Sequence, residues 1–181
     1  MIKGVFGSVF AGSEMLTRAT PLIFTGLAAA VAFRARLWNI GAEGQLYLGA
    51  MAAVAIGTGA LDISGFFLLP IIITFGCLMG AFGMVVPMAL KTRFGADEVV
   101  TTLLLNFIIL IFLQMMLEGP LKDPMGLGWP QSAPILDQGM LPTLLTRMRV
   151  HSGLIIGLVL AVILQIFINR SIWGFKLRAV G

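Results

Sequence analysis

The polar residues best suited to chemistry lie in one short stretch, NIGAEGQ, between two apolar runs. Asn39, Glu43 and Gln45 supply hydrogen-bond donors and acceptors, while Gly41 and Gly44 let the backbone leave helical geometry. Irregular backbone at membrane depth survives only inside protein or beside a water-filled cavity. The stretch therefore predicts a broken-helix element that lines a translocation path. An ordinary cytoplasmic loop before a helix start is the open alternative.

A second polar pair interrupts an apolar run further along the chain. Asn106 lies near the middle of that run, and Thr102 lies one turn earlier on the same helical face. In lipid such groups need partners, so they face the bundle interior or a pathway. Both roles, interhelical hydrogen bonding and contact with a substrate, stay open for Asn106.

Patterns for covalent chemistry are missing from the sequence. There is no GxxxxGK[ST] phosphate loop, so any ATP hydrolysis must come from a partner protein. His151 has no second histidine or cysteine at ligand spacing, and no metal or cofactor is expected. Asp97 and Glu98 have the position of acidic residues that favour a helix N-terminus. We therefore expect a protein that is not an enzyme.

The composition identifies the elements that must position these residues as membrane helices. Of the 181 residues, 59% are hydrophobic and only 11% are charged, less than half the charged share of a soluble domain. The net charge of +4 comes from basic residues scattered between apolar spans. Such residues orient a membrane protein, and no nucleic-acid partner is expected.

The apolar runs predict an all-α, polytopic transmembrane helix bundle with about five membrane segments. They cover residues 20–33, 42–61, 66–90, 99–117 and 153–168. The first run would rise only about 21 Å, less than a hydrocarbon core of about 30 Å. It must therefore continue through the residues up to Ile40 or stop at depth, so we expect the break near Asn39 and Gly44.

The loop charges predict the direction of each span. The loops at residues 91–98 and 169–181 carry Lys and Arg and are expected in the cytoplasm. The Pro- and Gly-rich connection at residues 118–150 is then external and ordered by turns, with a short interfacial helix in DQGMLPTLL. Met1 is expected outside, as for a chain whose first transmembrane helix is absent.

Four blocks of sequence resemble one family of transporters. RATPLIFTGLAAAVAFRARLWNIGAEGQLYLGA, RFGADEVVTTLLLNFI, GPLKDPMGLGWPQSAPI and WGFKLRAVG occur in the order found in permease subunits of bacterial nucleoside and simple-sugar ABC importers. That group also includes ribose and branched-chain amino-acid permeases. The resemblance covers nearly the whole chain and favours the broken-helix interpretation.

The resemblance implies a multi-pass permease of the bacterial inner membrane that imports a nucleoside or simple sugar by alternating access. Its partners would be an ABC ATPase subunit, a second permease subunit and an extracytoplasmic substrate-binding lipoprotein. Arg178 and Gly181 would begin the region that couples to the ATPase. Family members are about twice as long, so residues 1–181 are expected to be a partial permease domain, an N-terminal half.

An ion-coupled secondary transporter or channel subunit is the alternative function. Such a protein more often buries an Asp, Lys or Arg within a confident span. The predicted spans at residues 66–90, 99–117 and 153–168 contain none.

Overall fold

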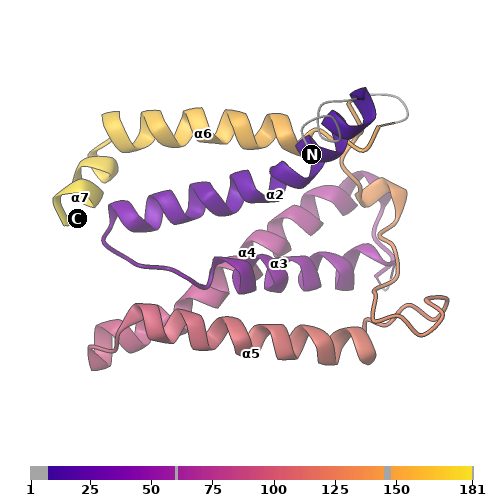
Figure 1. The fold of residues 1–181 in the computed structure, drawn as a ribbon, viewed down its shortest axis with the longest axis horizontal. Coiled ribbons are helices and arrows are strands. Elements are labelled where there is room, and N and C mark those ends of the chain that lie inside the picture. The colour runs from indigo at the N-terminus through magenta and orange to yellow at the C-terminus, as the bar shows by residue number, and fades with distance from the viewer. Residues whose placement is uncertain (1–7, 60, 145–147, 181) are drawn as a thin grey trace. The chain divides into compact units, whose positions relative to one another are not determined.

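The structure is a computed structural model that describes residues 8–59, 61–144 and 148–180. Within these residues the regular structure is helical. The helices are α2 (Val9–Arg34), α3 (Ala42–Gly57), α4 (Gly65–Phe94), α5 (Glu98–Glu118), the 3-10 helix η1 (Asp137–Gly139), α6 (Gly153–Arg170) and α7 (Ile172–Val180) (Figure 1).

Four helices are long and apolar enough to cross a membrane, namely α2, α4, α5 and α6. Their large apolar side chains are mostly exposed, as expected for helices surrounded by lipid. The all-α, multi-pass membrane fold is therefore confirmed. The predicted span at residues 42–61 corresponds to α3, which has only 16 residues and rises about 24 Å.

The chain divides into two compact units, one formed by the residues up to Leu37 and from Leu141 onward, the other by Trp38–Met140. In the first unit, α2 packs beside α6 (Figure 1). A Cβ atom added to Gly157 of α6 would lie 3.2 Å from Ile23 Cγ2 of α2. The missing side chain of Gly157 therefore lets the two helices approach closely.

The extent of α2 corrects the expectation of a short first span. The helix begins at Val9, where the Ser8 hydroxyl oxygen accepts a hydrogen bond from the Ala11 N–H at 3.1 Å. It runs for 26 residues, about 39 Å, which is enough for a full crossing. Glu14 in its first half faces Arg149 across 3.7 Å. Charged residues early in the run therefore do not end the helix.

In the second unit, glycines set the distance between α3 and α4. A Cβ atom on Gly49 would lie 2.8 Å from the Gly76 carbonyl oxygen, and one on Gly83 would lie 2.9 Å from Leu48 Cδ1. Close backbone approach through small residues is a common way for membrane helices to associate. At the far end of α3, a buried cluster joins Ile56 to Leu68 and Ile72 of α4.

The connections order the ends of the second unit. Gly95, with φ 66°, ends α4, and its N–H donates to the Lys91 carbonyl oxygen at 3.0 Å. The connection after α5 contains turns and the short helix η1, and the Leu136 N–H donates to the Gly57 carbonyl oxygen at 2.9 Å. The helix predicted in DQGMLPTLL is therefore limited to Asp137–Gly139, and Leu145 lies outside the described residues.

Candidate functional site

The predicted break is present as a non-helical segment at residues 35–41. Asn39, which is buried, folds its side chain back onto this segment. Its Oδ1 accepts the Gly41 N–H at 2.9 Å, and its Nδ2 donates to Gln45 Oε1 at 3.2 Å. Gln45 Nε2 in turn approaches Met84 Sδ of α4 at 3.4 Å. The polar side chains of NIGAEGQ thus hold the backbone where the helix is interrupted.

Two side chains of α5 complete the pairing of this backbone. The Ile40 N–H donates to Thr102 Oγ1 at 3.2 Å, and the Gly44 N–H donates to Asn106 Oδ1 at 2.6 Å. Thr102 and Asn106 are both buried. The first N–H groups of a helix have no partner within it, and lipid offers none. The α5 pair therefore satisfies donors that the break and the start of α3 leave free.

Gly41 and Gly44, the two glycines of NIGAEGQ, let the start of α3 lie close to α5. A Cβ atom on Gly41 would lie 2.9 Å from the Thr102 carbonyl oxygen, and one on Gly44 would lie 2.7 Å from Asn106 Oδ1 and 3.1 Å from Ile109 Cδ1. Gly41 is the residue before α3, while Gly44 lies inside it. Gly44 therefore does not mark the break itself, because its role is to let α3 touch α5.

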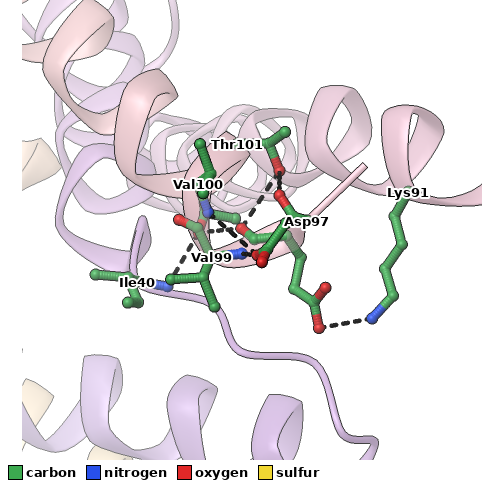
Figure 2. A network of polar contacts seen from close by, with 8 residues as sticks. Ile40, Lys91, Asp97, Val99, Val100 and Thr101 are labelled. Carbon is green, nitrogen blue, oxygen red and sulfur yellow. Dashed lines mark hydrogen bonds and ion pairs between the residues drawn. The ribbon is translucent and has the colours of Figure 1, made fainter. Parts of the chain in front are cut away.

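The start of α5 is fixed by its own cap and by an ion pair (Figure 2). Asp97 Oδ1 accepts the Val99 N–H at 2.7 Å, which confirms the predicted helix-start role of this residue. The Lys91 ammonium donates to Glu98 Oε1 at 2.6 Å. Thr102 Oγ1 also donates to the Glu98 carbonyl oxygen at 2.6 Å. These contacts hold the first turn of α5, from which Thr102 reaches Ile40.

Two polar groups at this junction remain available. The Glu43 side chain is exposed, and no hydrogen bond or ion pair reaches it from the residues that the structure describes. A carboxylate at membrane depth is expected to have a partner such as an Arg side chain or backbone N–H groups, and none is found for Glu43 in that part of the chain. Asn106 uses its Oδ1 on Gly44, while its Nδ2 has no partner within the described residues.

The structure brings most of the predicted site residues together. Asn39, Gln45 and Asn106, with both glycines, meet where α3 and α5 begin. Arg178 belongs to α7 in the other unit. Gly181 lies outside the described residues.

Sequence reasoning missed two contacts at this site. Thr102 was placed on the face of Asn106, but its bond to Ile40 depends on how α3 and α5 pair. The Lys91–Glu98 ion pair joins residues seven positions apart on either side of a turn. The charges in KTRFGADE were a usable signal, because opposite charges flank the Gly95 turn.

A cavity of about 580 Å³ in the second unit has a different character. Its lining comes from α3, α4, α5 and the residues that follow them, and every lining side chain is apolar, among them Met51, Phe75, Met79 and Phe112. Pockets for polar ligands carry a few placed polar groups. The polar junction at Asn39 and Asn106 is therefore the better candidate site for a polar ligand.

No group of three metal-ligating side chains occurs among the described residues.

Comparison with known proteins gives a consistent result along the chain. Residues 13–181 match a family model described as branched-chain amino acid transport system / permease component. The guanosine ABC transporter permease protein of Bacillus subtilis is 37% identical over 99% of this chain and 51% of its own length. The glucose ABC transporter permease protein of Haloferax volcanii is 34% identical over 96% of this chain and 48% of its own length.

A nucleoside ABC transporter permease protein of Lactococcus lactis is 31% identical over 97% of this chain and 50% of its own length. The chain thus spans about half the length of the curated relatives that it matches. No solved structure matches the chain.

Proposed function

Because this chain belongs to the family of permease components of branched-chain amino acid transport systems, we propose that it forms part of the translocation path of an ABC importer. The proposed substrates are nucleosides or simple sugars, because two of the matched permeases are named for guanosine and nucleosides and one for glucose. Similarity to the guanosine permease over nearly the whole chain is the observation that carries the proposal.

We place the path next to the junction of α3 and α5. Asn39 and Gln45 hold an interrupted backbone there, and Asn106 keeps its Nδ2 without a partner in the described part of the chain. A polar substrate needs such groups, because leaving water for an apolar wall costs several kcal/mol per unpaired polar group. At the same helix end, Glu43 supplies an exposed carboxylate that has no partner among the described residues. These features support a polar path at the start of α3.

The proposed partners follow from the importer mechanism. A separate ABC ATPase hydrolyses ATP, a substrate-binding lipoprotein delivers substrate outside, and a second permease subunit provides the opposite wall. The chain itself does no covalent chemistry, and it works as part of a larger permease domain in the bacterial inner membrane. Arg178 and Gly181 remain the proposed start of the segment that couples to the ATPase.

Uptake measurements test the transport function. In cells that express the permease with its ATPase and binding protein, we expect uptake of labelled guanosine or glucose that stops when the ATPase is inactivated. In vesicles, transport by the purified complex should require ATP on the side of the membrane that carries the ATPase. It should not require an ion gradient. Uptake that follows an ion gradient without the ATPase would establish an ion-coupled transporter instead.

Substitution of Glu43 tests whether the start of α3 belongs to the translocation path. Glu43→Gln removes the charge at the start of α3 and keeps the shape of the side chain. We expect reduced uptake with unchanged membrane insertion, because a carboxylate with no partner in the described chain is available to the path or to another subunit. Glu118→Gln, an exposed residue at the opposite end of α5, is the matched control. Equal uptake by both variants would remove Glu43 from the site.

A further inference from the structure

The helix α7 follows α6 almost directly, so the place of α6 in a membrane decides where α7 begins. The helix α6 has 18 residues and rises about 27 Å, close to the thickness of the hydrocarbon core. Only Ser171 separates its last residue from Ile172, the first residue of α7. If α6 crosses the bilayer, α7 must therefore begin in the layer of lipid headgroups.

The corner between α6 and α7 is closely built (Figure 1). The Ser171 hydroxyl oxygen accepts the Gly174 N–H at 2.8 Å. A Cβ atom on Gly174 would collide with the backbone carbonyl oxygens of Phe167 and Ile168. Only glycine therefore allows α7 to lie this close to the last turn of α6.

Arg178 links the two helices a second time. Its Nη2 donates to the carbonyl oxygen of Asn169 in the last turn of α6, and its Nε donates to the Gly174 carbonyl oxygen, both at 3.4 Å. A cation is favoured at a helix C-terminus, where carbonyl groups lack helical partners. The direction of α7 is therefore set by the corner.

The opposite side of α7 presents large apolar groups. Ile172, Trp173 and Phe175 are 76%, 69% and 65% exposed, while Gly174 is buried against α6. Lys176 lies on the same exposed side, with its Nζ 5.1 Å from the centre of the Trp173 ring. A basic helix with an aromatic, apolar face is typical of segments that lie in the membrane interface.

The charges around α7 favour an anionic lipid surface. Arg170, Lys176 and Arg178 are present between residues 169 and 181, and this segment contains no Asp or Glu. Anionic lipids of the cytoplasmic leaflet attract basic residues that flank a span, and Trp prefers the headgroup level. The helix α6, to which α7 is joined through Ser171, also exposes large apolar side chains.

We propose that α7 lies in the headgroup layer of the anionic leaflet, with Ile172, Trp173 and Phe175 inserted among the upper acyl chains. Arg170 and Lys176 then contact lipid phosphates. This role needs only that α6 crosses a membrane, and it is independent of the substrate or of transport. The competing occupant of the same face is the ATPase subunit, and the test separates the two.

Fluorescence quenching locates Trp173 directly. In a variant with Trp38→Phe and Trp129→Phe, Trp173 is the remaining tryptophan. We expect lipids brominated near the glycerol end of the acyl chain to quench its emission in vesicles of phosphatidylcholine and phosphatidylglycerol, while aqueous iodide has little effect. Quenching by iodide with none by brominated lipid would overturn the proposal.

Two further variants test the charges and the corner. Changing both Arg170 and Lys176 to Gln should remove the dependence of quenching on phosphatidylglycerol content. Gly174→Ala should lose the lipid quenching by displacing α7, whereas Gly26→Ala, where an added Cβ meets nothing within 4 Å, should keep it. Circular dichroism checks that both glycine variants retain their helices.

Addition of the cognate ATPase separates lipid from protein. If α7 lies in lipid, brominated lipid quenches Trp173 with or without the ATPase. If Trp173 is open to iodide until the ATPase binds and shields it, the apolar face is a docking surface for that subunit and the lipid proposal is wrong.

Discussion

At the scale of single residues, the junction of α3 and α5 depends on side-chain oxygens that replace missing helical partners. Thr102 accepts the Ile40 N–H of the interrupted segment, and Asn106 accepts the Gly44 N–H in the first turn of α3. A buried N–H without an acceptor is costly in any protein, and lipid gives it no alternative. The polar residues of α5 are therefore structural as well as candidates for substrate contact.

Truncation of Asn106 tests the stabilising part of that role. Asn106→Ala leaves the Gly44 N–H without its acceptor, which we expect to cost about 1 kcal/mol of unfolding free energy. Gln114→Ala is the control, because Gln114 is exposed on the same helix and makes no hydrogen bond in the described structure. Thermal unfolding in detergent should show a lower Tm for the Asn106 variant alone. Equal Tm values would mean that water or lipid headgroups replace the Asn106 oxygen.

The close approach at Gly44 gives a second test at the same scale. In Gly44→Ala the new Cβ atom would lie 2.7 Å from Asn106 Oδ1 and 3.2 Å from Asn106 Cα, so the Asn106 side chain must leave the Gly44 N–H or α3 and α5 must separate. Gly26→Ala adds the same methyl group where nothing lies within 4 Å, and alanine is favoured over glycine inside a helix by about 0.5–1 kcal/mol. We expect a lower Tm for Gly44→Ala and an equal or higher Tm for Gly26→Ala. An unchanged Tm for Gly44→Ala would show that the junction accommodates the methyl group without loss of stability.

At the scale of elements, α5 is the helix that organises the second unit. Its N-terminus is capped by Asp97, and its first turns carry Thr102 and Asn106 to the start of α3. Loss of the Asp97 cap should therefore destabilise the hydrogen bonds at the start of α3 as well as the first turn of α5.

Removal of the Asp97 cap provides the measurement. Asp97→Ala should destabilise the start of α5 by about 1 kcal/mol, the usual cost of losing a side-chain cap. Hydrogen exchange should become faster at the Val99 and Val100 amides, and also at Ile40, which depends on Thr102. Asp62→Ala serves as the control, because Asp62 is exposed in the connection before α4. Faster exchange confined to α5 would mean that the junction does not depend on the cap.

The elements were predictable from the sequence where apolar runs are long and uninterrupted. The predicted spans at residues 66–90 and 99–117 lie within α4 and α5. The predicted start of the first span, at residue 20, was wrong. Glu14 and Arg18 interrupt the apolar run before it, although neither residue ends a helix. Charge marks the depth of a residue in the membrane, while capping residues such as Ser8 mark where a helix begins.

The contacts of the candidate site were predictable only in part. The spacing of Thr102 and Asn106 placed both on one helical face, and the polar stretch near Asn39 identified the break. The hydrogen bonds of Thr102 to Ile40 and of Asn106 to Gly44 each join residues 62 positions apart, and no local sequence pattern predicts such a pairing. The close approach at Gly44 has the same origin, since a glycine in sequence does not reveal which helix it faces.

At the scale of the whole molecule, the two units share one arrangement of charge. In the first unit, Arg34 and Arg170 end the neighbouring helices α2 and α6. In the second, Lys91 and Arg93 lie in the last turn of α4, next to the start of α5. The positive-inside rule assigns the basic end of each unit to the cytoplasm.

Cysteine labelling tests this topology. In a Cys77→Ala background, Met125→Cys should react with an impermeant maleimide from outside, and Thr92→Cys only after the membrane is opened. Both positions are exposed in the structure, so a lack of reaction reflects the side of the membrane. Reaction of both cysteines from the same side would contradict the assignment of α4 and α5 as consecutive crossings.

The separation between the break and α5 has a consequence for biosynthesis. Synthesis proceeds at about 5–20 residues per second, so a gap of 62 residues delays Thr102 and Asn106 by roughly 3–12 s after Ile40 and Gly44. During that time the N–H groups of the break lack their α5 acceptors, and a lipid environment supplies none. The nascent segment must therefore wait in water or in the insertion machinery. We therefore expect α3 to enter the bilayer together with α5, later than its place in the order of synthesis.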